Sequence, residues 1–168
     1  MANGIEYKTY QTTQNNEIQN ITNPTKEGHS FNGWYLDADC ENKITDWTEY
    51  LNLNSSQNTT VYAGFTVNQY TISFATNGGS EVDEISQNYN TTITEPTTPT
   101  KAGYVFDGWF KDVNLTQRFT FNKMPAENLT LYPKYLACFN VNSSGQITGV
   151  TTAGRMLKIL LFQKVLTV

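Results

Sequence analysis

The stretch Pro99–Phe110, which reads PTKAGYVFDGWF, decides the fold because the chain carries its pattern twice. Residues Pro24–Tyr35 read PTKEGHSFNGWY, the same pattern 75 positions earlier. A second pair follows at an offset of 70, namely Asn58–Phe65 (NTTVYAGF) and Asn128–Tyr135 (NLTLYPKY). The change of offset places a five-residue difference in length between the two motifs, where loops usually vary. Self-similarity at this spacing indicates a tandem repeat.

The composition favours small, folded, β-rich units. The chain has 168 residues, of which 38% are apolar and 13% aromatic, and this aromatic area offsets the entropy cost of ordering a polar chain. Abundant Asn and Thr favour turns and strands over long helices. The net charge of −4 provides no positive field to attract a nucleic acid. We see no signal peptide at the N-terminus, and the apolar run near the C-terminus is too short to span a membrane.

The first half of the second copy predicts two strands and a turn. Residues Tyr70–Thr76 alternate large apolar with small or polar side chains, which is typical of a half-buried strand. Asn77-Gly78-Gly79 then supplies residues that accept a positive φ angle and indicates a turn. Val82, Ile85 and Tyr89 predict a second, weaker strand.

The remainder of the copy predicts a helical turn and two more strands. We expect Thr94–Gly103 to begin as a short capped turn of α- or 3₁₀-helix, because proline fits a first helical turn and glycine fits its exit. Tyr104–Phe110 predicts a third strand, in which Gly108 would let the following indole or a neighbouring backbone approach closely. After a tight turn at Met124–Asn128, residues Leu129–Tyr135 predict the closing strand.

These motifs resemble the Listeria–Bacteroides repeat, the B-repeat of internalin-type bacterial surface proteins. An NGG turn, a PTKxGYxFxGW motif and a KMPxxxxTLYxxY close carry the resemblance, which covers Tyr70–Leu136 fully and Ile21–Phe65 less completely. The resemblance implies an α+β, mainly β fold: tandem, small β-grasp-like modules with short antiparallel or mixed sheets and at most one short helical turn each. We therefore expect a first module at residues 1–67 and a complete module at residues 68–137.

The first copy departs from the pattern at its beginning. A shift of the NGG turn by 75 positions lands on residues 2–4, so the counterpart of Tyr70–Thr76 would precede Met1. Either the chain begins inside a repeat, which this comparison favours, or Ile5–Tyr10 substitutes for the strand. A missing strand would leave an unpaired sheet edge. We therefore expect residues 68–137 to fold alone and residues 1–67 not to do so.

The sequence offers no catalytic, metal-binding or cofactor-binding residues. His29 stands where the second copy has Tyr104, which favours a packing or surface role over catalysis. The segment Asp37-Ala38-Asp39-Cys40-Glu41 spaces its carboxylates like calcium ligands, but Asn42 stands where an EF-hand loop needs Gly and Thr48 where it needs Glu. A solvated acidic loop is the better interpretation. We expect no cofactor and infer that the protein is not an enzyme.

The recurring aromatic and glycine residues admit two interpretations. Trp34 and Trp109 could form an aromatic platform for sugars, but their recurrence in strands favours core packing, because a small module needs a few large residues to fill its core. The residues that define the repeat are assigned a structural role: Gly28, Phe31, Gly33, Trp34, Tyr62, Gly78, Gly79, Gly103, Phe106, Gly108, Trp109 and Tyr132. The sequence identifies no binding surface.

The resemblance also implies a function and a place. It implies a non-enzymatic repeat module of a secreted, extracellular or cell-surface bacterial protein that takes part in adhesion or host interaction. Its partners would be a host or cell-surface protein, a glycan, and the neighbouring repeats of the parent chain, but no nucleic acid. Two alternatives stay open: a passive spacer that presents a neighbouring leucine-rich repeat domain, and an accessory module of a secreted enzyme.

The last segment, residues 138–168, follows neither copy. Cys138–Val150 resembles the start of a BspA-like leucine-rich repeat segment, a frequent neighbour of B-repeats. The apolar run Lys158–Val168 has a possible back-translation that reads DIVIPKGVNG when shifted by two nucleotides, which resembles the expected continuation. We therefore expect a truncated segment with a frameshift near Ala153–Lys158, with an ordinary C-terminal helix or extra strand as the alternative.

Overall fold

The computed structural model describes residues 5–9, 22–47 and 60–156. The chain forms two compact units, the first made of residues 1–69 and 88–90 and the second of residues 70–87 and 91–168. Strands in mixed and antiparallel sheets make up most of the regular structure, with a short helix at residues 152–156. The expected mainly β class is therefore confirmed.

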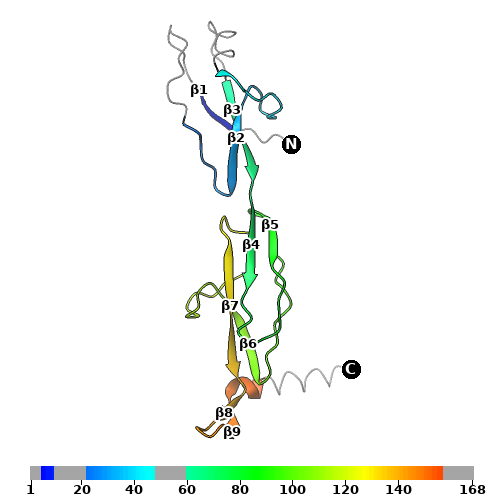
Figure 1. The fold of residues 1–168 in the computed structure, drawn as a ribbon, viewed down its shortest axis with the longest axis vertical. Coiled ribbons are helices and arrows are strands. Elements are labelled where there is room, and N and C mark those ends of the chain that lie inside the picture. The colour runs from blue at the N-terminus through cyan, green and yellow to red at the C-terminus, as the bar shows by residue number, and fades with distance from the viewer. Residues whose placement is uncertain (1–4, 10–21, 48–59, 157–168) are drawn as a thin grey trace, which may run out of the picture. The chain divides into compact units, whose positions relative to one another are not determined.

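The first unit contains a three-stranded sheet in the order β1-β3-β2. Strands β1 (Ile5–Thr9) and β2 (His29–Tyr35) both pair antiparallel with the central β3 (Thr60–Val67), as Figure 1 shows. Strand β1 is part of the segment that the sequence offered as a substitute for the missing first strand. Among the described residues of this unit, no strand runs parallel to β3.

The second unit contains a four-stranded sheet in the order β5-β4-β7-β6. Strands β4 (Gln69–Phe74) and β7 (Leu129–Ala137) form a central parallel pair. Strand β5 (Ile85–Asn88) flanks β4, and β6 (Tyr104–Phe110) pairs antiparallel with β7. All four expected strands are present, and the third has the expected bounds.

The helical turn expected within Thr94–Gly103 is wrong. Residues 93–101 are neither helix nor strand, and a simple turn at residues 102–103 leads into β6. Glu95 and Thr98 each precede a proline, and the proline ring disfavours the α conformation of the residue before it. The connection from β5 to β6 therefore crosses as extended chain.

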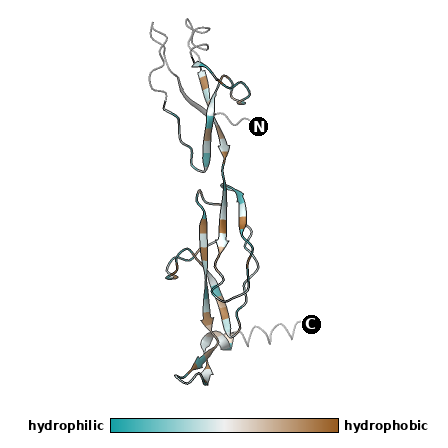
Figure 2. Ribbon diagram, in the orientation of Figure 1, coloured by the Kyte–Doolittle hydropathy of each residue, from teal (hydrophilic) through white to brown (hydrophobic). Residues whose placement is uncertain are grey.

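The core of the second unit surrounds Trp109. Its indole is 2% exposed and packs with fully buried Ile72 and Leu131, which lie on the central strands β4 and β7. Ile93 and Met124 complete this cluster, although the sequence placed Met124 in a turn and assigned Ile93 no role. Figure 2 shows hydrophobic residues along the strands of this sheet. The core thus draws on connecting segments as well as strands.

The first unit has a smaller core built around Trp34. Trp34 on β2 is buried with three residues of β3, namely Val61, Ala63 and Phe65, and Phe31 packs against them. Trp34 and Trp109 occupy equivalent repeat positions and are both buried, so both are core residues.

A two-stranded hairpin follows the second sheet. Strand β8 (Phe139–Val141) pairs antiparallel with β9 (Ile147–Val150), and Thr151 caps the helix at residues 152–156 by accepting a hydrogen bond from the Gly154 amide at 3.1 Å. The apolar run Lys158–Val168, on which the frameshift expectation rests, lies outside the described residues.

Candidate functional site

The first unit carries a concave pocket of about 280 Å³ beside β2. Strands β2 and β3, the turn before β2 and the loop after it all contribute to its wall. Its lining mixes a cation, a carboxylate, an imidazole, amide and hydroxyl groups, and two apolar side chains: Lys26, His29, Asn32, Tyr35, Asp39, Cys40, Phe65, Thr66 and Val67. Such a mixture can bind polar groups that both donate and accept hydrogen bonds.

The turn at Gly28 positions the basic side of the pocket. Gly28 has a φ angle of 67°, a left-handed conformation that glycine adopts without steric cost, and the His29 amide donates to the Lys26 carbonyl across the turn at 3.0 Å. Within the described residues, the Lys26 ammonium has no ion pair or hydrogen bond and lies 5.6 Å from the centroid of the Phe65 ring.

A loop held by Asp37 positions the opposite side. The Asp37 carboxylate accepts hydrogen bonds from the backbone amides of Glu41 at 3.0 Å and Asn42 at 2.8 Å. These two bonds hold the pKa of Asp37 below its ordinary value, because they favour the charged form. The carboxylate organises its own loop, and among the described residues no group of three or more His, Cys, Asp or Glu residues is arranged to hold a metal ion.

The pocket cysteine is not an activated nucleophile. Desolvation raises the pKa of the Cys40 thiol, and the negative charges of Asp37 and Asp39 raise it further. Nucleophilic cysteines need the opposite environment, a lowered pKa beside positive charge. The imidazole of His29 bonds through Nδ1 to the Glu27 carbonyl at 2.8 Å. Neither side chain therefore has the setting that nucleophilic catalysis requires.

In the second unit, the lysine at the equivalent position contacts other side chains and the backbone of the same unit. Lys101, the counterpart of Lys26, donates to the Asn77 carbonyl at 2.6 Å and lies over the rings of Tyr104 and Tyr135, 4.7 and 5.1 Å from their centroids. The ammonium thereby ties the NGG turn to the start of β6. Lys26 makes no such hydrogen bond among the described residues, whereas Lys101 is a structural tether.

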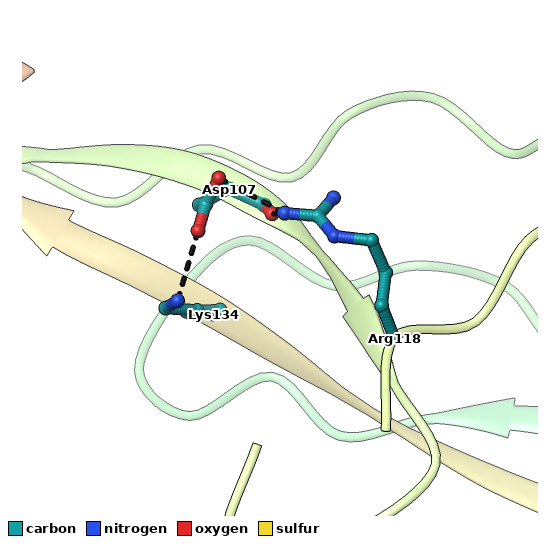
Figure 3. A network of polar contacts seen from close by, with 3 residues as sticks. All are labelled: Asp107, Arg118 and Lys134. Carbon is teal, nitrogen blue, oxygen red and sulfur yellow. Dashed lines mark hydrogen bonds and ion pairs between the residues drawn. The ribbon is translucent and has the colours of Figure 1, made fainter. Parts of the chain in front are cut away.

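An ionic network crosses the β6–β7 edge of the second unit (Figure 3). One carboxylate oxygen of Asp107 lies 3.0 Å from Arg118 Nη2, and the other lies 3.1 Å from Lys134 Nζ. Arg118 also donates to the Asp107 carbonyl. Desolvation raises the pKa of Asp107, but the hydrogen bonds and charges of Lys134 and Arg118 outweigh it and hold the pKa below its ordinary value.

The first unit replaces this network with neutral groups. Asn32 stands in place of Asp107 and Gly64 in place of Lys134. The Asn32 amide donates to Thr66 Oγ1 at 3.0 Å and accepts from the Tyr35 hydroxyl at 3.3 Å. A Cβ at Gly64 would lie 2.2 Å from the Tyr35 ring, so no larger residue fits. Of the residues that line the pocket, only Lys26 has the same residue type in the other copy.

The glycine before each tryptophan lies at a bulge and beside a long cationic side chain. Gly33 and Gly108 have φ angles of 142° and 110° at the position where each strand pairing shifts register. A Cβ at Gly108 would meet the Arg118 guanidinium at 2.1 Å, and one at Gly33 would meet the Lys43 side chain at 2.4 Å. At both positions the glycine makes room for a long cationic side chain.

The other signature residues lie in the core or in turns. Phe31 and Phe106 pack against the two cores, and both Tyr62 and Tyr132 are half-buried. Gly78 has a φ angle of 78° in the turn after β4, and a Cβ at Gly79 would lie 2.0 Å from the Tyr135 hydroxyl. None of these side chains is among those that line the pocket. The repeat comparison missed the pocket because it selects residues that the two copies share, whereas most residues of the pocket differ between the copies. The differences at these positions were the signal that could have identified the pocket.

The family model of the Listeria–Bacteroides repeat domain matches residues 1–64 and again residues 70–134. The chain belongs to this family. The first match runs from β1 into β3 and the second from β4 into β7, so the repeat seen in the sequence, the duplicated sheet register and the family model agree.

Proteins similar to these two repeats occur in bacteria. The chain is 36% identical to Internalin H of Listeria monocytogenes over 82% of its length. It is 37% identical over 79% of its length to a protein of Evansella cellulosilytica named as a membrane protein, and 38% identical over 77% to another from that organism, named as a Gly-rich membrane protein.

The chain spans only a fraction of these relatives, with matches that cover 20%, 15% and 25% of the two Evansella proteins and Internalin H, respectively. The comparisons thus support a repeat module of a surface protein. In the part of the chain that the structure describes, no helix has the length and hydrophobicity needed to cross a membrane.

Proposed function

We propose that this chain is a non-enzymatic interaction module of a bacterial cell-surface protein, and that its first repeat contacts a host or cell-surface protein or glycan through the Lys26 pocket. Membership of the Listeria–Bacteroides repeat family and similarity to Internalin H support the surface-protein setting. The observation that carries the proposal is the Lys26 ammonium in a polar pocket, where it makes no ion pair or hydrogen bond with the described residues, whereas the equivalent Lys101 donates to the Asn77 carbonyl.

The chemistry of the pocket suits a hydroxyl-rich or amide-rich group. Lys26 and Asn32 can donate hydrogen bonds, the exposed carboxylate of Asp39 can accept them, and Phe65 and Val67 provide apolar wall. These are the groups presented by glycans and by peptide segments. The sheet order with a central parallel pair also supports the β-grasp-like description of the module.

Binding of the full chain to a glycan array and to cultured host cells tests the proposal. We expect Lys26→Ala to weaken binding by about tenfold, the usual loss when a charged group that bonds a ligand is removed. Lys101→Ala is the matched control, because the same residue type is removed from the same repeat position, where its ammonium bonds to the Asn77 carbonyl. Equal losses from both variants would place the binding surface elsewhere.

The alternative function is a passive spacer that presents a neighbouring domain such as a leucine-rich repeat. The observation that favours it is the tandem arrangement of two units with the same β2–β3 and β6–β7 register. A full chain that melts cooperatively but binds no glycan, host protein or cell surface would support the spacer over adhesion. Within either function, the repeats act beside their neighbours in the parent protein.

A further inference from the structure

The dipeptide Asn-Gly occurs three times in the chain, as Asn3-Gly4, Asn32-Gly33 and Asn77-Gly78. The backbone nitrogen of the residue after an asparagine can attack the side-chain amide carbon of that asparagine, and glycine hinders this attack least because it has no Cβ. Asn3 lies outside the described residues, whereas Asn32 and Asn77 lie within them. The surroundings of Asn32 and Asn77 therefore show which of the two is open to this reaction.

Asn77 and Gly78 are the exposed central residues of the turn after β4. The Gly79 amide donates to the Thr76 carbonyl across this turn at 2.8 Å, and φ angles of 46° at Asn77 and 78° at Gly78 match a type I′ turn. Within the described part of the chain, neither the Asn77 side chain nor the Gly78 amide makes a hydrogen bond. No bond to the described residues therefore has to break at either reacting group.

Asn32 is followed by the same residue but is held by its neighbours. It lies within strand β2, which pairs with β3. Its side-chain amide donates to Thr66 Oγ1 at 3.0 Å and accepts from the Tyr35 hydroxyl at 3.3 Å. Attack by the Gly33 nitrogen would require these two bonds to break within a paired strand. Asn32 is therefore the protected counterpart of Asn77.

Lys101 holds the backbone of Asn77 in its turn conformation. Its ammonium donates to the Asn77 carbonyl at 2.6 Å and lies over the rings of Tyr104 and Tyr135. A left-handed residue directs the next backbone nitrogen away from its own side chain, so the Cα–C bond of Asn77 must rotate before the Gly78 nitrogen can reach the side chain. That rotation carries the carbonyl away from the ammonium. The Lys101 bond therefore has to break before the reaction.

We propose that Asn77 is a site of spontaneous deamidation and that the bond from Lys101 to its carbonyl limits the rate. The Gly78 nitrogen attacks Asn77 Cγ and forms the new C–N bond of a five-membered succinimide. The bond between Cγ and Nδ2 breaks, and the side-chain nitrogen leaves as ammonia with the proton from the Gly78 amide. Water then opens the ring: cleavage at Cγ gives aspartate, and cleavage at the main-chain carbonyl gives isoaspartate.

The products change the charge and the length of the turn. Both place a carboxylate close to the Lys101 ammonium, and isoaspartate adds a methylene to the main chain. The turn has little room for a longer backbone, because a Cβ at Gly79 would lie 2.0 Å from the Tyr135 hydroxyl. Deamidation thus converts a neutral turn of the repeat into a charged one, and its extent records the age of the second unit.

Ageing of the full chain at mildly alkaline pH tests the site. Peptide mapping by mass spectrometry measures deamidation at each asparagine, and methylation by an isoaspartyl methyltransferase detects isoaspartate. The chain unfolded in urea is the reference, in which Asn32 and Asn77 should react at comparable rates because glycine follows both. In the folded chain we expect Asn77 to react at least about tenfold faster than Asn32, since a surface turn opens more readily than a paired strand. Equal rates in the folded chain, or a faster Asn32, would overturn the proposal.

Replacement of Lys101 tests the control of the rate. Lys101→Met removes the ammonium and should accelerate deamidation of Asn77 about two- to tenfold, the range expected for the loss of one hydrogen bond. Lys101→Arg keeps a cationic donor and should stay closer to the rate of the parent chain. An unchanged or slower rate in Lys101→Met would show that this bond does not restrain the turn.

Lys134→Met is the matched control in the same unit. Lys134 is also a partly exposed lysine, but its ammonium pairs with Asp107 and not with the turn. We expect deamidation of Asn77 to be unchanged in this variant. An acceleration equal to that of Lys101→Met would assign the effect to a general loss of stability and would overturn the role of Lys101.

Discussion

The first and second units use the same scaffold to present different surfaces. In both units, a tryptophan that follows a glycine bulge fills the core. The strand that carries the tryptophan pairs with its neighbour in the same register in both units, with Phe31 opposite Phe65 and Phe106 opposite Tyr135. On the exposed side, the second unit carries the Asp107 network and the first carries neutral Asn32 beside a pocket. Burial restricts which residue types can occupy the core side of the repeat, whereas the residues on its exposed side differ between the two units.

The exposed residues nevertheless change together. Lys134 accompanies Asp107, whereas Gly64 accompanies Asn32, because a side chain at position 64 would collide with Asn32 and Tyr35. Replacing the carboxylate alone would leave two cations without their counter-charge. The difference between the units therefore behaves as one coordinated exchange, and in the first unit Asn32 lines a pocket.

The shared core provides the largest test of the comparison. Trp109→Ala removes an indole that is 2% exposed and should destabilise the second unit by about 3–5 kcal/mol, close to the whole stability of so small a fold. Trp34→Ala should have a comparable effect on the first unit, since Trp34 is 5% exposed. Urea unfolding followed by hydrogen exchange measures both. A Trp109→Ala chain with an unchanged transition would revive the sugar-platform interpretation.

The glycine bulge at Gly108 tests how strongly the nearby Arg118 side chain constrains the backbone. Gly108→Ala places a Cβ at a φ angle of 110° and against the Arg118 guanidinium, so we expect a loss of about 1–3 kcal/mol in the second unit. Gly145→Ala is the control, because Gly145 also has a positive φ, 77°, but no neighbour within 4 Å. If both alanines cost the same, the close packing of Arg118 contributes nothing.

The ionic network tests the exposed half. Asp107→Asn should destabilise the second unit by about 0.5–1 kcal/mol at low salt and by less at high salt, because these pairs are partly exposed and screened. In the first unit, the carboxylate introduced by Asn32→Asp would have no lysine at position 64 to pair with. This variant should therefore gain no stability. Thermal melts at two salt concentrations distinguish the two variants. A gain from Asn32→Asp would contradict the idea of a coordinated exchange.

The loop carboxylates give the smallest expected effect, a pH dependence. Desolvation raises the pKa of Asp112, but hydrogen bonds from the Gln117 and Thr116 amides outweigh it, so its pKa lies below the ordinary value near 4. A lowered pKa means that its contribution to stability is present above about pH 4 and is lost as the pH falls through the folded value. Asp112→Asn should flatten the fall of melting temperature below pH 4. A slope identical to that of the parent chain would contradict this.

Asp37 should behave in the same way in the first unit, because its loop has the same construction. Its carboxylate binds two backbone amides, and Cys40 adopts the same φ angle of 57° as Leu115. Asp37→Asn and Asp112→Asn therefore form a matched pair. A pH effect confined to one of them would show that the two loops are not equivalent.

Local patterns were enough to locate the strands but not every connection. The strand at Tyr104–Phe110 was predicted because alternating apolar residues and a terminal glycine and tryptophan are signals within one segment. The turn in Thr94–Gly103 was mispredicted because helix-start signals were weighed above the restriction that each proline places on its predecessor. Met124 was missed as a core residue because its burial comes from neighbours distant in sequence.

The sequence by itself determined the repeat, the positions of most strands and the buried role of the two tryptophans, because these follow from residue spacing and side-chain size. Only the tertiary structure decided that β4 lies parallel to β7 and that Lys101 bonds to the Asn77 carbonyl, whereas Lys26 makes no ion pair among the described residues. Each of these depends on which segments meet after folding. Contacts between residues that are far apart in the sequence produce no periodic sequence pattern, so only the folded structure reveals them.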